Sequence, residues 1–333
     1  MPTWPRAMSN SQRWPGSEKA LTNQRDFSHH SRVIQASIIT LSFNRPEALQ
    51  HCLRSLAGQT VETKRFESII VDVSDEPVSG IIEAFEKELQ IHHVRAANGG
   101  VAANRNIGAA EARAPLLLFI DDDCRAEPDW LENMLACARS NPGALIGGGV
   151  INSNPKNAVS TAGQVITEAV DLHFNADKKT PTFFPGLNFG MPREDYLALG
   201  GCDESFGRLA AEDREFSARW RRSGRPLAAA PMARVVHDHR MDIPGFMRQY
   251  FNYGRGAWKL HECLSARSDE GIPNVVRSHV GLVRHLATPI SRLEPVMQVK
   301  VMPLLILWEL MNLFGFVWQS ILSRRGRWRP DDG

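Results

Sequence analysis

Hydrophobic and polar positions alternate between a strand pattern and a helix pattern over roughly residues 37–123. Short runs rich in β-branched and aliphatic residues predict strands in "SIITL", "FESIIVDVSDE", residues 91–94 and "PLLLFIDDD". Between these runs the apolar residues recur at intervals of three and four, which predicts helices carrying Leu49, Cys52, Leu53 and Leu56, and then Ile81, Ile82, Phe85 and Leu89. Strands that alternate with helices indicate a parallel sheet with helices on both faces.

Polar residues stand where the predicted strands end. Asn44 follows the first strand, Asp72 closes the second, and Asp121, Asp122 and Asp123 close the strand of residues 115–120. Ligands of parallel sheets bind in the crevice outside the carboxyl ends of the strands. We therefore expect these side chains to line one site.

The three consecutive aspartates suggest a divalent cation. If the segment is extended, residues two apart point the same way, so Asp121 and Asp123 converge while Asp122 turns aside. Converging carboxylates repel each other unless a hard cation such as Mg²⁺ or Mn²⁺ binds between them and keeps positions open for phosphates. The alternative is that they cap the next helix, for which Asp129 is better placed.

A second acidic pair occurs at residues 212–213. The stretch "AAEDREFSARWRRSG" reads as a helix start, and the glycine-rich "GGCDESFGRL" precedes it. The helix dipole favours an ionised carboxylate at Asp213, which suits a general base. From the residues alone, the better interpretation is that Glu212 and Asp213 simply begin a helix.

Composition describes an ordinary folded chain of 333 residues, with 43% hydrophobic and 23% charged residues. The net charge of +2, from 39 basic and 37 acidic residues, does not indicate nucleic-acid binding. Five scattered cysteines without a CxxC pair argue against a disulfide framework and a structural zinc site. We expect a reducing, cytoplasmic setting.

The two ends of the sequence differ from the centre. Residues 1–32 are polar, lack an apolar stretch of signal-peptide length and predict a mobile tail. Residues 241–333 predict a helical extension, in which "VKVMPLLILWELMNLFGFVWQSIL" is apolar over a membrane-spanning length. Three alternatives stay open for that run: a helix in the inner leaflet's interface anchored by Trp328 and the neighbouring arginines, a packed or dimer helix, and a membrane span.

The ordered set "SFNRPE", "IIVDVSDE", "NGGVAANRNIGAAEA", "FIDDDCRAEPDWL", "GLNFGMPREDYLALGGCDESFGRLAAEDREFSARWRRSG" and "VVHDH" resembles the family 2 glycosyltransferases over roughly residues 37–255. The resemblance implies an α/β GT-A fold, a mostly parallel central sheet flanked by helices with a helical C-terminal extension. A catalytic domain would span residues 33–240, with a nucleotide-binding half at 33–130 and an acceptor half at 131–240.

The resemblance also implies roles for individual residues. Asp121 and Asp123 match the ends of the DXD motif, and His237, or His239 two residues on, is where some relatives complete the metal shell with Mn²⁺ or Mg²⁺. Asp213, with Glu212, matches the ED motif that supplies the base. The nucleotide-sugar site would include Leu41, Phe43, Asn44, Asp72, Gly100, Arg105, Asn106, Asp121 and Asp122. For the glycines and for the histidine pair, helix capping and ordinary packing are the alternatives.

The implied activity is a metal-dependent, inverting and non-processive transfer of one sugar from a UDP- or dTDP-sugar to a glycan, lipid-linked or small-molecule acceptor. Arg219-Trp220 resembles part of the QxxRW signature of processive synthases, but Phe216 occupies the glutamine position, so we expect helix packing there. The alternative functions are a sugar-nucleotide pyrophosphorylase, for which no phosphate-binding loop is evident, and a catalytically inactive binding module.

Overall fold

The computed structural model describes residues 34–177, 179–238, 241–267 and 281–325, and from Ile34 onward the chain forms one compact unit. The predicted mobile tail at residues 1–32 lies outside the described residues, as do His239, Arg327, Trp328 and Arg329. The predicted boundaries of the catalytic domain and of its two halves stay predictions.

The described chain alternates strands and helices in its first half and becomes helical toward its C-terminus. The strands are β1 (Ala36–Ser42), β2 (Phe66–Asp72), β3 (Ile91–Arg95), β4 (Leu116–Ile120), β5 (Cys124–Ala126), β6 (Leu145–Asn152), β7 (Asn188–Pro192) and β8 (Leu227–His237). The α-helices are α1 (Pro46–Ala57), α2 (Ser79–Glu83), α3 (Val101–Glu111), α4 (Trp130–Ser140), α5 (Ala158–Phe174), α6 (Arg193–Ala198), α7 (Glu212–Arg222), α8 (Ile243–Arg267), α10 (Ala287–Ser291) and α11 (Pro295–Arg324). Two 3₁₀ turns, Thr63–Arg65 and Glu204–Phe206, complete the described elements.

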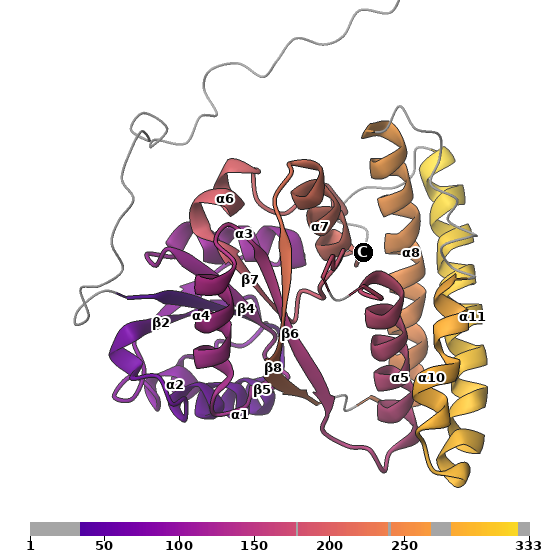
Figure 1. The fold of residues 1–333 in the computed structure, drawn as a ribbon, viewed down its shortest axis with the longest axis horizontal. Helices are drawn as coiled ribbons and strands as arrows, with labels where there is room; N and C mark the ends of the chain where they lie inside the picture. Colours follow the sequence, from indigo (N-terminus) through magenta and orange to yellow (C-terminus); the bar gives the residue numbers. More distant parts are fainter. Residues whose placement is uncertain (1–33, 178, 239–240, 268–280, 326–333) are drawn as a thin grey trace, which may run out of the picture. The chain divides into compact units, whose positions relative to one another are not determined.

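The strands form one eight-stranded mixed sheet in the order β3-β2-β1-β4-β7-β6-β8-β5. β1, β2, β3 and β4 are parallel, as predicted, and β6 is parallel to β8. β7 is antiparallel to both neighbours, and β5 is antiparallel to β8. The predicted α/β class with a largely parallel sheet is confirmed, and Figure 1 shows this sheet flanked by helices.

Most predicted elements appear close to their expected positions. α1 starts at Pro46, where the missing N–H costs nothing, and buries Leu49, Cys52, Leu53 and Leu56. α2 is the exception, because only Ser79–Glu83 is helical and turns continue to Leu89. The four apolar residues of the predicted helix, Ile81, Ile82, Phe85 and Leu89, still pack on the core. The apolar spacing therefore identifies the residues of a buried face but not the length of the helix.

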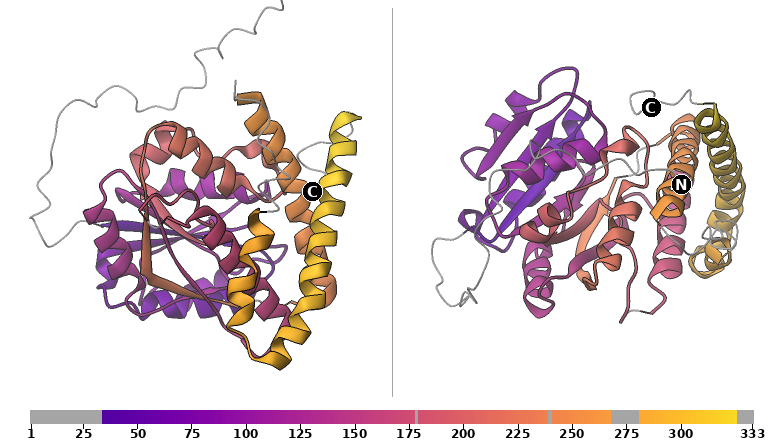
Figure 2. Two further views of the ribbon diagram at one scale, coloured as in Figure 1. Left: turned by 45° about the vertical axis from the view of Figure 1, so that its right-hand side comes forward. Right: turned by 90° about the horizontal axis from the view of Figure 1, so that it is seen from above.

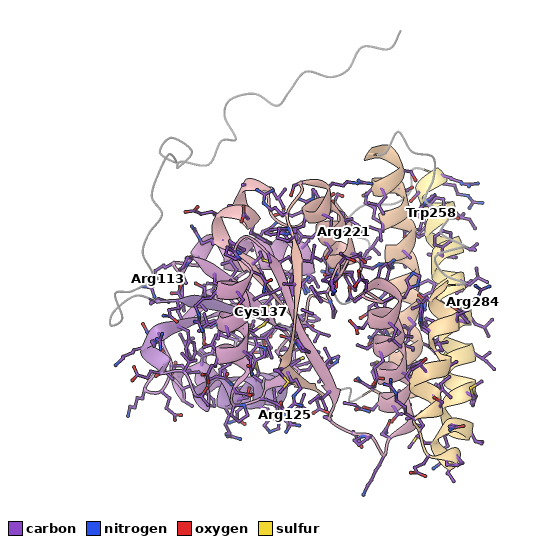
Figure 3. All side chains as sticks on the ribbon, viewed as in Figure 1. Arg113, Arg125, Cys137, Arg221, Trp258 and Arg284 are labelled. Atoms are coloured by element: carbon purple, nitrogen blue, oxygen red, sulfur yellow. The ribbon has the colours of Figure 1, made fainter. Side chains whose placement is uncertain are left out.

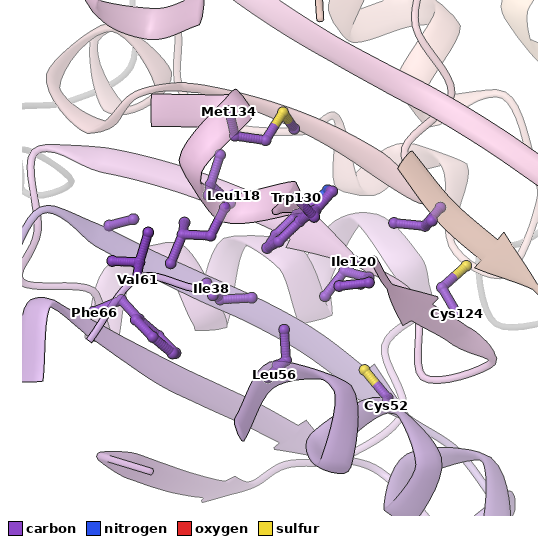
Figure 4. Packing of buried hydrophobic residues seen from close by; sticks show 14 of the residues in the cluster. Ile38, Cys52, Leu56, Val61, Phe66, Leu118, Ile120, Cys124, Trp130 and Met134 are labelled. Atoms are coloured by element: carbon purple, nitrogen blue, oxygen red, sulfur yellow. The ribbon is translucent and has the colours of Figure 1, made fainter. Parts of the chain in front are cut away.

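Two apolar layers cover the sheet. On one face, α1 and α4 pack over β1, β2 and β4, with Trp130 fully buried beside Leu118 (Figure 4). On the other face, α3, α6 and α7 pack around Phe119, Phe189 and Trp220. The buried indole of Trp220 stacks near Phe216 and donates to the Pro226 carbonyl at 3.0 Å, so the Arg-Trp pair is helix packing as predicted.

A separate helical layer made of α5, α8, α10 and α11 has its own apolar core (Figures 1 and 2). Within this layer α8 and α11 approach closely at glycines. A Cβ on Gly254 would lie 2.1 Å from the Asn312 carbonyl oxygen, and a Cβ on Gly315 would lie 2.0 Å from the Phe251 carbonyl oxygen. These two contacts require glycine on each helix and fix α11 against α8.

Candidate active site

The three aspartates after β4 form a tight turn. The Cys124 N–H donates to the Asp121 carbonyl at 3.0 Å, and β5 begins at once. The backbone therefore differs from the extended segment that the sequence predicts, but the side chains still alternate. Asp122 is fully buried, whereas the side chains of Asp121 and Asp123 are 36% and 18% exposed.

Arg45, at the entrance to α1, holds this turn. Its guanidinium lies 2.6 Å from Asp122 Oδ1 and also contacts Asp123 Oδ2. Burial raises the pKa of Asp122 to about 8, although the charge of Arg45 opposes that shift. The buried Asp122 anchors the turn, and its direct contact with a nucleotide sugar stays a prediction.

His237 reaches the same turn from the end of β8, opposite Cys124 in the β5–β8 ladder. Its Nε2 lies 3.4 Å from Asp123 Oδ1. Burial lowers the pKa of His237, but the hydrogen bond to Asp123 and the charge of that carboxylate raise it by more. His237 therefore lies beside Asp123, and the role of both residues as metal ligands stays a prediction.

The donor set fits a divalent cation. Ligand atoms of Asp123, Cys124 and His237 all lie within 4.8 Å of one another. Burial raises the pKa of the Cys124 thiol well above its usual value, and a soft sulfur atom is in any case a poor ligand for a hard cation. One carboxylate and one imidazole remain, which leaves positions for phosphate oxygens, as Mg²⁺ and Mn²⁺ require. Asp121 lies outside this cluster, and its role as a ligand stays a prediction.

Arg105 of α3 connects the aspartate turn to the acidic pair of α7. Its Nη1 donates to Glu212 Oε1 at 2.7 Å, and its Nη2 lies 3.9 Å from Asp121 Oδ1. The guanidinium is buried beside the rings of Phe119 and Phe189, 5.9 and 5.3 Å from their centroids. One buried cation therefore lies between acidic groups that are 91 positions apart in the sequence (Asp121 to Glu212).

The acidic pair begins α7, as predicted. Ala211, just before it, has a left-handed backbone with φ of 79°, which is costly for alanine and is typical of a constrained functional segment. Burial and the neighbouring Asp213 raise the pKa of Glu212 to about 7, while Arg105 opposes the shift. Asp213 accepts hydrogen bonds from the backbone N–H groups of Gly186 at 3.0 Å and Arg214 at 2.8 Å.

The predicted nucleotide pocket lies at the ends of β1 and β2. Asn44, with φ of 54°, exchanges side-chain and backbone hydrogen bonds with Asp75, and its N–H donates to Ser74 Oγ. Leu41 is partly buried under this loop, and the Phe43 ring is 46% exposed. An exposed aromatic ring at this edge suits stacking on a base.

Asp72 is buried and accepts hydrogen bonds from the N–H groups of Ser74 and Val78 and from Arg95 Nη1 at 2.9 Å. Burial raises its pKa, but these hydrogen bonds lower it by more. The side chain thus shapes the loop after β2. Its direct contact with a nucleotide stays a prediction.

Gly100 and Asn106 hold α3 in place. A Cβ on Gly100 would lie 1.8 Å from the Gly207 carbonyl oxygen, and Gly100 has φ of 92°, so only glycine fits this helix start. Asn106 bonds Cys202 through both N–H and carbonyl groups and accepts from Tyr196 Oη at 2.6 Å. These contacts make both residues supports of the site, and their direct roles in donor binding stay predictions.

Two residues near the site have no role that the sequence predicts. Arg45 is visible in the sequence only as a helix start, and Gly186 only as part of a loop. Tyr253 of α8, which the sequence places either beside the acceptor or on a solvated helix face, is 46% exposed. Three residues later, a Cβ on Gly256 would lie 2.1 Å from the Ala210 carbonyl oxygen, just before the acidic pair. The C-terminal helices therefore border the site.

Comparisons with known proteins point to one family. The family model described as "Glycosyl transferase family 2" matches residues 37–198. A validoxylamine A glucosyltransferase of Streptomyces hygroscopicus subsp. jinggangensis is 28% identical over 229 residues, covering 60% of this chain and 54% of the relative. A glucosyl-dolichyl phosphate glucuronosyltransferase of Haloferax volcanii is 27% identical over 183 residues, covering 54% of this chain and 49% of the relative. The chain spans about half the length of these curated relatives.

Among solved structures, a mannosyltransferase of Pyrobaculum calidifontis in complex with GDP-Man and Mn²⁺ superposes with a TM-score of 0.60 at 13% identity. The match covers 93% of this chain and 92% of that one. At this identity the likeness shows the fold alone. It extends over nearly the whole length of both chains.

Proposed function

We propose, since the chain belongs to the family 2 glycosyl transferases, that it transfers one sugar from a UDP- or dTDP-sugar to an acceptor hydroxyl with inversion at the anomeric carbon. The acceptor would be a glycan, a lipid-linked sugar or a small molecule. The transfer would depend on Mn²⁺ or Mg²⁺ and add a single residue.

The observation that carries this proposal is the position of Arg105. Its guanidinium lies between Glu212 and Asp121, at 2.7 and 3.9 Å. The contact brings the turn that fits a metal beside the helix start that carries the candidate base. A sugar diphosphate bound to the turn would therefore present its anomeric carbon toward Asp213.

The residues of the chain divide the reaction between them. As the acceptor oxygen bonds to the anomeric carbon, the bond from that carbon to the diphosphate oxygen breaks and the diphosphate leaves with the electron pair. Asp213 takes the proton of the acceptor hydroxyl, held in place by the N–H groups of Gly186 and Arg214. Arg105 keeps the neighbouring Glu212 paired, so that only one of the two carboxylates needs to accept a proton.

Asp123 and His237 would hold the cation, and when bound it neutralises the charge of the leaving diphosphate. Arg45 is the second positive group at this turn. Because it contacts Asp123, it must share that carboxylate with the cation or turn toward the diphosphate.

Asp213→Asn tests the assignment of the base. We expect the turnover of UDP- or dTDP-sugars, measured as release of the nucleoside diphosphate with Mn²⁺ or Mg²⁺, to fall by about 10²–10⁴-fold. The melting temperature should fall only modestly, because asparagine keeps the size of aspartate and its one carbonyl oxygen still accepts from one of the two N–H groups.

Glu194→Gln is the matched control, because Glu194 is an exposed acid in the first turn of α6. It should leave turnover unchanged. Equal turnover in wild type and Asp213→Asn would remove Asp213 as the base. If no nucleotide sugar is bound or cleaved with any divalent metal, the proposed function itself is wrong.

A further inference from the structure

α11 exposes an unbroken apolar strip to solvent. Between Lys300 and Arg324 every residue that the structure places at the exposed surface of this helix is apolar, namely Met302, Pro303, Ile306, Leu310, Leu313, Phe314, Val317, Trp318 and Ile321. These residues cover about 20 positions, or roughly 30 Å along the helix axis. We call them the α11 strip. A continuous apolar surface of this kind marks an interaction site.

The opposite side of α11 packs against the rest of the helical layer. Val301, Leu304, Leu305 and Trp308 pack into the helical layer with Phe246 and Tyr250. Buried Gln319 accepts from Arg255 Nε of α8 at 3.0 Å. Figure 2 shows α11, in yellow, as the outer helix of this layer, with the sheet on the far side of α8.

These contacts disfavour a membrane span. α11 is the one helix, among those described, that is long and apolar enough to cross a membrane. Crossing would separate it from α8, break the buried Arg255–Gln319 bond and expose the close backbone contacts at Gly254 and Gly315. A helix that stays packed on its own domain and exposes one apolar face can instead lie at a membrane surface, with only that face in the lipid.

The charges at the two ends of the α11 strip favour a lipid surface over a second copy of the chain as its partner. The α11 strip is bounded by exposed Lys300 at one end and exposed Arg324 and Arg325 at the other. Two strips packed antiparallel about their middle would place Lys300 of one copy near Arg324 of the other, and a parallel pair would place like residues together. Both arrangements bring cations together, whereas anionic headgroups match the cations at both ends.

Arg284 adds to this pattern, because it is exposed at the same helical layer (Figure 3). Trp318, 47% exposed near the arginine end, is an aromatic residue of the type that membrane interfaces favour. From these observations we propose that the α11 strip lies in the interface of an anionic lipid membrane, parallel to its plane. This inference goes beyond the proposed function and does not depend on it.

Flotation of the full-length protein with vesicles tests the proposal without any donor or acceptor. We expect the wild type to float with phosphatidylcholine vesicles containing about 30% phosphatidylglycerol and to bind pure phosphatidylcholine several-fold less. The double variant Ile306→Glu/Leu313→Glu should lower the partition coefficient by about tenfold or more, because it places two charges within the strip.

Met232→Glu is the matched control, since Met232 is 55% exposed on β8, away from α11. It should float like the wild type. Arg324→Gln/Arg325→Gln is a second variant that leaves the strip intact, and it should reduce the preference for anionic vesicles. Circular dichroism and melting curves should be unchanged for all three.

Four results would overturn the proposal: no flotation of the wild type, equal flotation of the Ile306→Glu/Leu313→Glu variant, a wild-type dimer without lipid that this variant converts to a monomer, or membrane-bound protein that alkaline carbonate fails to release. The third result would assign the strip to a second copy of the chain, and the fourth to a membrane span.

Discussion

At the scale of single residues, Arg105 is a buried cation on which the site depends. It is buried and pairs with Glu212, itself 7% exposed. Removing one partner of a buried ion pair leaves the other charge uncompensated. Arg105→Met should therefore lower the free energy of unfolding by about 3–5 kcal/mol, as measured by urea denaturation.

Glu212→Gln provides the control for this prediction through a double-mutant cycle. The double variant Arg105→Met/Glu212→Gln should be more stable than Arg105→Met alone, because no buried charge is then left unpaired. Additive losses in the two single variants would show that the pair does not interact in the folded protein.

Sequence reasoning finds most charged residues of the site but not their partners. Asp121, Asp123, Glu212, Asp213 and His237 follow from their positions at the ends of predicted elements. The contacts made by Arg45 and Arg105 depend on how loops far apart in the sequence come together. No local pattern of one sequence encodes such distances. Asp72 and Asp122 show the same limit, because burial rather than residue type decides what a carboxylate contacts.

At the scale of elements, Glu67 joins β2 to β1 and to the loop after α3. Its carboxylate accepts from Ser37 Oγ at 2.6 Å and from the Arg113 N–H and Nε at 2.8 and 2.7 Å. Burial raises the pKa of Glu67, but these hydrogen bonds lower it by more, so the folded value lies below the unfolded one. The stabilisation is therefore present above the unfolded pKa of about 4.3 and is lost as pH falls through the folded pKa.

Glu67→Gln should accordingly lower the free energy of unfolding by about 1–3 kcal/mol at neutral pH. The difference should shrink as pH falls below about 4, where the wild-type carboxylate also becomes neutral. Melting curves over this pH range measure it, with Glu86→Gln at an exposed position as the control. A difference that stays constant with pH would show that the charge of Glu67 is not involved.

Gly256 links α8 to the loop before α7. A Cβ there would lie 2.1 Å from a backbone oxygen, so Gly256→Ala must displace α8 or the Ala210–Ala211 segment. We expect a loss of about 1–3 kcal/mol in stability, despite the better helix propensity of alanine, and slower sugar transfer because Glu212 follows that segment.

Gly58→Ala is the matched control, because its φ is −87° and the nearest atoms would lie 3.6 and 3.8 Å from an added Cβ. It should leave both stability and transfer near wild-type values. Comparable losses in both variants would mean that the Gly256 contact has no special role.

The elements themselves are largely predictable from period and composition. Residues 81–89 are the instructive exception, since Ile82, Phe85 and Leu89 are buried without a continuous helix. Apolar spacing records which side chains face the core, whereas the length of a helix also depends on the competing turns. The aspartate turn is similar, because its alternating exposure arises from a turn instead of an extended strand.

At the scale of the whole molecule, the helical layer and the catalytic sheet meet through α8. One side of α8 contacts α11 at Gly254, and the other contacts Ala210 at Gly256. The sequence shows where the sheet rhythm ends but leaves three alternatives for the apolar run of residues 299–322. Our proposal of an interfacial helix rests on the packing of α8 against both neighbours and on the exposed α11 strip, neither of which can be read from the sequence.

The central claim is that Asp123, on the turn after β4, holds the cation that binds the nucleotide. Titration calorimetry of UDP and dTDP, with and without Mn²⁺, tests it most directly, using the wild type, Asp123→Ala and Asp129→Ala. Asp129 precedes α4 without a side-chain capping bond and is the nearby acidic control. We predict that Mn²⁺ strengthens nucleotide binding by the wild type and by Asp129→Ala but not by Asp123→Ala. Equal metal dependence in all three proteins would contradict the account.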